Sequence, residues 1–295
     1  MKLQNGESMI LINQRGYITS YSRVKESDFM RRRFLMYIAL LGLLLVGLAG
    51  CGKANSESSV HKIKDRGTLV VGMISANPPY EYQVTKNGQT KEAGADVRLV
   101  KKVAAQLGVK YQIKTMDLDG LLPALQAGKV DMLITSLSPT PERKQGAKFS
   151  KIYYKSTNTL VVPKNKLTQY QNSDNFAHAT IAVVNNSTQD ALIKKQFPHA
   201  NIKRLAKVTD LALAVNNGKA DAFAMDVPTA TILLRQNPNL AMTKWRHDDS
   251  SLGAAIALPK NSSQDLVQAV NKVINNNKDS YAKWVQYYAQ HGDVN

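Results

Sequence analysis

From Gly67 onward, short apolar runs alternate with segments whose apolar residues recur at helical spacing. Residues 68–73 (TLVVGM) and 130–134 (VDMLI) are typical of buried strands. Between them, 95–107 predicts a helix that ends at Gly108. This alternation predicts an α/β fold. It also predicts strands at 110–115, 158–163, 180–184, 202–206, 221–225 and 253–258, and helices at 189–196, 208–217, 227–235, 263–276 and 279–289.

An apolar run at 34–48 precedes this region and follows three arginines at 31–33. It is too short to span a bilayer comfortably and fits the apolar part of a secretory signal. The run ends in LAGC at 48–51, which resembles the lipobox of bacterial lipoproteins, where the Cys is diacylated and becomes the mature N-terminus. The alternative is a chance cysteine after a transmembrane helix. We expect an anchor at Cys51, because the only cysteine of the chain stands at the cleavage point. A diacylated cysteine is a plausible anchor, since two acyl chains hold a protein far better than one.

Residues 1–50 are therefore predicted to be a leader and signal peptide that is cleaved. Translation from Met30 would give an ordinary signal, since Met30 directly precedes the arginines. Otherwise 1–29 would be an extended cytoplasmic leader without a fold, and mass spectrometry of the unprocessed precursor distinguishes the two. The small polar residues after Cys51 predict a tether, which we place at 51–63.

Charge and cysteine content narrow the function classes. The chain of 295 residues has a net charge of +17, and residues 1–50 hold seven of its 39 Lys/Arg and three of its 22 Asp/Glu, which leaves +13 on the rest. A secreted, basic, anchored protein most simply faces an anionic membrane or wall. No basic cluster carries interleaved aromatics, so nucleic acid is not expected as a partner. A single cysteine excludes an internal disulfide and a four-cysteine zinc site.

The sequence contains no enzyme signature. Its five histidines are scattered without HExxH spacing, and GxSxG, GxxxxGK[ST] and GxGxxG are absent. We therefore expect a protein that is not an enzyme, with no catalytic residues, no metal and no cofactor.

Two helix-to-strand turns of the chain are weakly similar in sequence. Residues 125–132 (LQAGKVDM) resemble 215–222 (VNNGKADA), and Ser136 and Asp226 each stand eight residues after the glycine of their turn. Both would lie at the carboxyl end of a strand, where open α/β sheets place their ligands. Two such halves predict a cleft between lobes. The alternative is that Gly-Lys-x-Asp is only a common turn.

Two loops place hydroxyl groups before predicted helices. In 135–143, Thr140 is the predicted N-cap, and Arg143 offers a planar fork that matches a carboxylate. In the other half, Ser187 with Asp190 three residues later resembles a capping box. Such helix ends favour anions. The alternative is an ordinary capped helix with a solvated arginine.

Asp226 follows the apolar strand and precedes a proline, so it could simply cap the next helix. Opposite Arg143 it would instead complete a clamp for a zwitterion. Arg143 and nearby amides would hold a carboxylate, and Asp226 would hold an ammonium.

The chain resembles the type 3 extracellular solute-binding proteins, the amino-acid receptors of ABC importers. The resemblance runs from about residue 65 to 290, and the order and spacing of its motifs make it specific. The motifs are Pro79-Tyr80-Glu81, Gly94-Ala95-Asp96-Val97, Gly120-Leu121-Leu122-Pro123-Ala124-Leu125, Gly128-Lys129-Val130-Asp131, Thr140-Pro141-Glu142-Arg143 and Phe149-Ser150-Lys151-Ile152-Tyr153-Tyr154.

The resemblance implies a type II periplasmic-binding-protein-like fold, with two lobes joined by two crossing strands. Lobe 1 would comprise 64–156 and 250–295, and lobe 2 would comprise 157–249. The lobes would close on a ligand held in the cleft. The implied ligand-binding residues are Tyr80, Leu118, Ser136, Ser138, Arg143, Ser187, Thr188 and Asp226, with Ile74 and Asn77 nearby.

Departures from the family pattern bear on the ligand. Ile74 and Asn77 stand where some members have an acid and an aromatic, and Leu118 stands where many have an aromatic. The missing acid weakens the case for a cationic ligand, so we expect a polar uncharged L-amino acid.

We interpret the chain as a monomeric lipoprotein receptor at the outer face of the cell membrane, held by diacylglyceryl-Cys51, that delivers an amino acid to an ABC permease. One rival is a dehydratase or lyase of small acids on the same scaffold, which would need a further acid or base in the cleft. The other rival is a ligand-sensing partner of a signalling protein.

Overall fold

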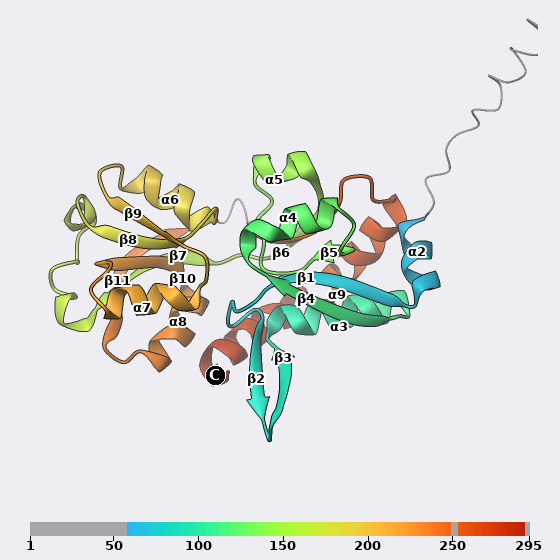
Figure 1. The fold of residues 1–295 in the computed structure, drawn as a ribbon, viewed down its shortest axis with the longest axis horizontal. Helices are drawn as coiled ribbons and strands as arrows, with labels where there is room; N and C mark the ends of the chain where they lie inside the picture. The colour runs from blue at the N-terminus through green and yellow to red at the C-terminus, as the bar shows by residue number, and fades with distance from the viewer. Residues whose placement is uncertain (1–57, 249–252, 293–295) are drawn as a thin grey trace, which may run out of the picture. The chain divides into compact units, whose positions relative to one another are not determined.

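The computed structural model describes residues 58–248 and 253–292 (Figure 1). Its first element is helix α2 (Ser59–Arg66), whose N-terminus is capped by the Ser58 hydroxyl. Residues 59–63, assigned to the tether from their polarity, instead belong to the folded part, because this helix buries Ile63 in the core. The leader, signal peptide and Cys51 lie outside the described residues.

The first sheet has the strand order β4-β1-β5-β12-β6. Strand β1 (Thr68–Ile74) pairs in parallel with β4 (Lys110–Met116) and with β5 (Met132–Leu133). Strand β12 (Ala254–Pro259) pairs antiparallel with β5 and with β6 (Ala147–Tyr154). The C-terminal part of the chain therefore completes the sheet that the N-terminal part begins.

Helices cover both faces of this sheet, and alternate residues of β1 face opposite cores. Val71 packs with α3 (Ala95–Leu107), whereas Val70 packs with α4 (Leu118–Gln126). The bounds of α3 match the prediction. Helix α5 (Pro141–Gly146) begins after the Thr140 cap, and this too confirms the prediction.

The chain ends in one long helix, α9 (Gln264–His291), which packs on α3 and β6. The prediction of two helices, at 263–276 and 279–289, is wrong. Residues 264–291 contain no glycine or proline, and the buried face continues without interruption through Ile274, Tyr281 and Val285. A polar stretch that remains on the outer face of a helix does not end it.

Strands β2 (Tyr82–Lys86) and β3 (Gln89–Ala93) form a separate hairpin that the sequence analysis missed. Asn87 and Gly88 occupy its turn with φ angles of 53° and 73°. An Asn-Gly pair favours this turn because both positions need positive φ. That dipeptide was the available signal.

The second sheet has the order β11-β7-β10-β8-β9. Its strands are β7 (Thr157–Pro163), β8 (Thr180–Val184), β9 (Asn201–Leu205), β10 (Ala222–Asp226) and β11 (Leu240–Asp248). Strand β8 pairs in parallel with β9 and β10, while β7 pairs antiparallel with β10 and β11.

Strands β7, β8 and β10 of the second sheet are buried on both faces, so they read as mostly apolar runs. Phe223 packs into one core with α7 (Thr209–Asn216) and α8 (Val227–Gln236). Ala222 and Ala224 pack into the opposite core with α6 (Thr188–Gln196) and the 3₁₀ helix η2 (Ser173–Phe176). A second short 3₁₀ helix, η1 (Lys164–Lys166), follows β7.

These two sheets with their helices confirm the predicted α/β class. Strands β6 and β11 were not predicted, and only Met132–Leu133 of the predicted strand 130–134 pair in the ladder. The chain passes from the first sheet to the second through Lys155–Ser156, between β6 and β7. The predicted lobe boundaries, after residues 156 and 249, remain a prediction.

Candidate functional site

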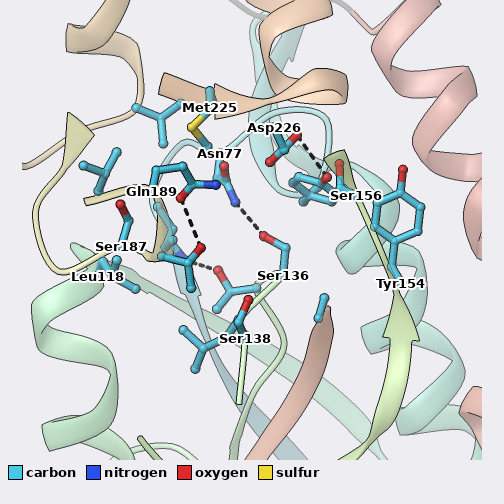
Figure 2. Close-up of a pocket in the computed structure, with 18 of the residues that line it drawn as sticks. Asn77, Leu118, Ser136, Ser138, Tyr154, Ser156, Ser187, Gln189, Met225 and Asp226 are labelled. Atoms are coloured by element: carbon cyan, nitrogen blue, oxygen red, sulfur yellow. Dashed lines mark hydrogen bonds between the residues drawn. The ribbon is translucent and has the colours of Figure 1, made fainter. Parts of the chain in front are cut away.

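A cavity of about 100 Å³ lies between residues of the two sheets (Figure 2). Loops after β1 and β5 line it from one side, and the starts of α6 and α8 line it from the other. The structure places all ten predicted ligand-contact residues on its wall, although their contact with a ligand stays a prediction. They are Ile74, Asn77, Tyr80, Leu118, Ser136, Ser138, Arg143, Ser187, Thr188 and Asp226.

Hydrogen bonds hold the loop after β5 in place. Ser136 adopts a φ of 46°, which is uncommon for a residue other than glycine. Its backbone N–H donates to Asp96 Oδ2 at 2.6 Å and to the Tyr153 hydroxyl at 2.9 Å. Its own hydroxyl accepts a hydrogen bond from Asn77 Nδ2 at 3.0 Å (Figure 2). These bonds fix a conformation that the backbone alone would not favour.

Arg143 lies in the first turn of α5, half-buried at the cavity wall. Its Nη1 donates to the Ser138 carbonyl and its Nη2 to the Asn186 carbonyl, both at 3.0 Å. Burial lowers the pKa of the guanidinium from its ordinary value, and the neighbouring Glu142 opposes this effect. A guanidinium has five N–H donors, so donors remain for an anion.

Asp226 ends β10 and caps α8, where its Oδ1 accepts from the Thr229 N–H at 2.9 Å. The same oxygen accepts from the Tyr80 hydroxyl at 3.2 Å. Burial raises the pKa of this carboxyl, and the bonds from Thr229 and Tyr80 oppose the rise. Asp226 therefore caps α8 and also lines the cavity. The two roles are compatible, because the cap uses only one of its two carboxylate oxygens.

The second predicted loop leads into α6. Ser187 Oγ accepts from the Asp190 N–H at 3.1 Å, so Ser187 is the N-cap. The Asp190 side chain does not complete a capping box. It forms a bidentate ion pair with Arg204 at 2.7 and 2.9 Å, because β9 brings that arginine beside the helix.

Several lining residues were missed by the sequence analysis. Tyr154, Ser156 and Asn158 line the cavity where the chain passes between the sheets, and their two-residue spacing is that of one face of an extended chain. Gln189 directly follows Thr188 and donates to Asn158 Oδ1 at 2.8 Å. Its position next to the predicted site residue Thr188 could have identified Gln189 as a lining residue. The other missed residues are Thr135, Leu137, Val184, Val208, Met225, Gly253 and Ala254.

Behind the cavity lie two buried carboxyls, Glu81 and Asp96, which are 3% and 0% exposed. Glu81 Oε1 accepts from the Thr135 hydroxyl, and Asp96 Oδ1 accepts from the Tyr281 hydroxyl at 2.7 Å. Burial and the neighbouring Asp96 raise the pKa of Glu81 well above its ordinary range. Burial also raises the pKa of Asp96, to about 6.

The raised pKa of Asp96 predicts a stability that depends on pH. A carboxyl with a higher pKa in the folded state stabilises the fold below its unfolded pKa, and that contribution is lost as pH rises through the folded value. Between pH 4 and pH 7 the loss from Asp96 should be about 2 kcal/mol. Urea unfolding should therefore show Asp96→Asn gaining about 2 kcal/mol relative to the wild type across this range.

The control is Asp117→Asn, which changes an exposed carboxylate whose side chain caps nothing. If this variant showed the same gain with pH as Asp96→Asn, the effect would not be particular to the buried carboxyl. A constant difference between wild type and Asp96→Asn would contradict the prediction.

Within residues 58–248 and 253–292, no group of three or more His, Cys, Asp or Glu side chains is placed to hold a metal ion. The helices of this same part of the chain include none that is long and apolar enough to cross a bilayer.

Comparisons of the sequence and of the structure both find solute-binding proteins. The sequence model of the family described as bacterial extracellular solute-binding proteins, family 3, matches residues 69–291. The probable histidine-binding protein of Campylobacter jejuni is 29% identical over 241 residues, covering 82% of this chain and 91% of that protein. The arginine-binding extracellular protein ArtP of Bacillus subtilis is 27% identical over 256 residues, covering 85% and 94%.

Among solved structures, the chain resembles an amino acid ABC transporter substrate-binding protein from Streptococcus pneumoniae bound to L-arginine. The TM-score is 0.75 at 32% identity, and the match covers 79% of this chain and 98% of that one.

Proposed function

We propose that this chain, which belongs to the bacterial extracellular solute-binding proteins of family 3, captures a polar uncharged L-amino acid and delivers it to an ABC importer. The observation that carries the proposal is the pairing of Arg143 with Asp226 on one cavity wall. Arg143 comes from the side of the first sheet, and Asp226 ends a strand of the second.

A free amino acid matches this pair of charges. Its carboxylate would bind the remaining donors of Arg143, the Thr188 hydroxyl and the amides of that loop. Its ammonium would bind Asp226, with help from the Ser136 and Ser138 region. Micromolar affinity corresponds to about 8 kcal/mol, and several charge-assisted hydrogen bonds are strong enough to supply it. Because the contacts come from both sheets, binding would favour closure of the cleft.

The rest of the wall supports an uncharged side chain on the ligand. Among the described residues that line the cavity, Arg143 and Asp226 are the only charged ones. A lysine or arginine ligand would bring a third charge without a partner at the wall, which is costly in a desolvated site. Polar amides are present instead, on Asn77, Asn158 and Gln189.

Calorimetry and thermal unfolding of residues 52–295 with each of the twenty amino acids and cystine test this proposal. A neutral polar amino acid present at 100 times its dissociation constant should raise the free energy of unfolding by about 2.7 kcal/mol. Tightest binding of arginine, lysine, glutamate or aspartate would contradict the proposed ligand class. Failure of every amino acid to bind would contradict the receptor function itself.

The same proposal holds that the protein binds the amino acid without converting it to a product. Asp226 is the only carboxylic acid on the cavity wall among the described residues, and it already serves as a helix cap and a hydrogen-bond acceptor. An enzyme of the dehydratase or lyase class would need a separate acid or base there. The NMR spectrum of a bound amino acid should therefore stay unchanged on long incubation, and appearance of a product would favour the enzyme.

We also place the receptor at the outer face of the cell membrane, anchored through diacylglyceryl-Cys51, as a monomer that meets an ABC permease. The sequence motif at 48–51 supports the anchor. Cys51→Ser should release the protein from the membrane fraction, and mass spectrometry of the wild-type N-terminus should find a diacylated cysteine. An unmodified Cys51 would contradict the anchor alone and leave amino-acid binding unaffected.

A further inference from the structure

One carboxylate at the edge of the cavity joins elements of the two sheets. Asp119 lies in the first turn of α4, next to Leu118 of the cavity wall. Its Oδ2 accepts from Asn185 Nδ2 at 2.9 Å, and its Oδ1 accepts from Asn186 Nδ2 at 2.7 Å. Both asparagines lie in the turn between β8 and α6. Each oxygen of this side chain therefore has a donor from the opposite side of the cleft.

The turn that meets Asp119 also meets the proposed ligand anchor. The Asn186 carbonyl accepts from Arg143 Nη2, and the next two residues, Ser187 and Thr188, line the cavity. Asn186 has a φ of 56°, a left-handed conformation in which asparagine is one of the few favoured side chains. This conformation presents the Asn186 amide to Asp119 and its carbonyl to Arg143 at the same time.

Neither partner is explained by local helix capping. The N-cap position of α4 is Asp117, whose side chain makes no capping hydrogen bond, and the N-cap of α6 is Ser187. Asp119 is exposed and could be solvated by water, as an acid in the first turn of a helix usually is. Its two long-range bonds therefore exist only while the turn between β8 and α6 lies against α4.

We propose that Asp119 is a closure residue, which holds the Asn185–Asn186 turn against α4 and thereby stabilises the closed cleft around the ligand. This inference rests on the proposed function for its biological meaning but not for its geometry. Bonds made only in the closed form raise its population relative to the open form. Their loss should speed ligand release more than it slows capture, because the ligand enters the open form.

The test measures opening directly in the full chain. Spin labels on cysteines introduced at Lys101 of α3 and Leu213 of α7, both exposed, report the separation of the two sheets in a Cys51→Ser background. Pulsed electron spin resonance is recorded without added amino acid and along a titration with an equimolar mixture of the twenty L-amino acids. The variants are Asp119→Ala and, as matched control, Asp117→Ala on the same helix.

In Asp119→Ala, the distances should move toward the longer, open population, and half-saturation should need about tenfold more of the mixture. Asp117→Ala should behave like the parent. Asn186→Gly tolerates the positive φ and removes one of the two donors to Asp119, so it should open the cleft in the same direction but less than Asp119→Ala. Combining it with Asp119→Ala should add little further opening, because the Asn186 side chain has then already lost its acceptor.

Distances in Asp119→Ala that match the parent, with or without the mixture, would overturn the inference. Failure of the parent to respond to the mixture would instead count against the proposed function. The distances recorded without added amino acid would still test the closure residue.

Discussion

Replacing Arg143 with alanine is expected to weaken amino-acid binding at least a hundredfold while the fold persists. The guanidinium is half-buried at the cavity wall, and it already spends two donors on the Ser138 and Asn186 carbonyls. A ligand carboxylate that loses its charged partner in such a site forfeits about 2–5 kcal/mol. Isothermal titration calorimetry with the amino acid that binds the wild type tightest measures the loss.

Two further variants separate the contributions of Arg143. Arg143→Lys keeps the charge but loses the planar fork, so it should recover only part of the affinity. Lys144→Ala removes the neighbouring exposed cation of α5 and should bind like the wild type. Part of the loss in Arg143→Ala comes from the bond to Asn186, and Asp119→Ala measures weakening of that turn with the guanidinium intact. Near-normal affinity in Arg143→Ala would refute the proposed clamp.

Asp226 should contribute as much to ligand affinity as Arg143, but its role as a helix cap has to be separated from its role in binding. Asp226→Asn retains a good N-cap for α8, since asparagine caps helices as well as aspartate does. It removes the negative charge that would face the ligand ammonium. We expect at least a hundredfold weaker binding with little change in stability, measured by calorimetry and by urea unfolding.

Asp226→Ala should lose the cap as well, and so lose about 1 kcal/mol of stability in addition to the affinity. Asp210→Asn, which neutralises an acid in the first turn of the neighbouring helix α7, is the control for net charge. If Asp226→Asn bound normally, Asp226 would be a helix cap and nothing more.

The central strands β7, β8 and β10 of the second sheet could be predicted because they are buried on both faces. Strand β8 has the predicted bounds, because TIAVV is a short, almost wholly apolar run rich in β-branched residues. Strand β11 was missed although its second half alternates between exposed and half-buried residues, which is itself a signal for a strand. Strand β6, which also lies at a sheet edge, was missed as well.

The candidate site divides in the same way. Ser136 and Asp226 could be found because each follows a recognisable strand, and their position at a strand end is a local property of the chain. Arg143 was recognisable from the N-cap and proline that precede it. The pair Glu81–Asp96 and the contact of Asp119 with Asn186 involve residues 15 and 67 positions apart. No local pattern marks such pairs, because each member by itself looks like an ordinary polar surface residue.

Local chemistry thus settles which segments become helices and buried strands, where helices begin, and which charged groups end the strands of each half. Those outcomes depend on side chains within a few positions of one another, where spacing and capping act directly. The fold in space settles the rest: that β12 returns to the first sheet, that ten separated residues share one cavity wall, and that Asp119 meets the turn of the opposite half. Burial of the two sheets and their helices decides these contacts, and the free energy of that burial belongs to the whole chain rather than to any segment.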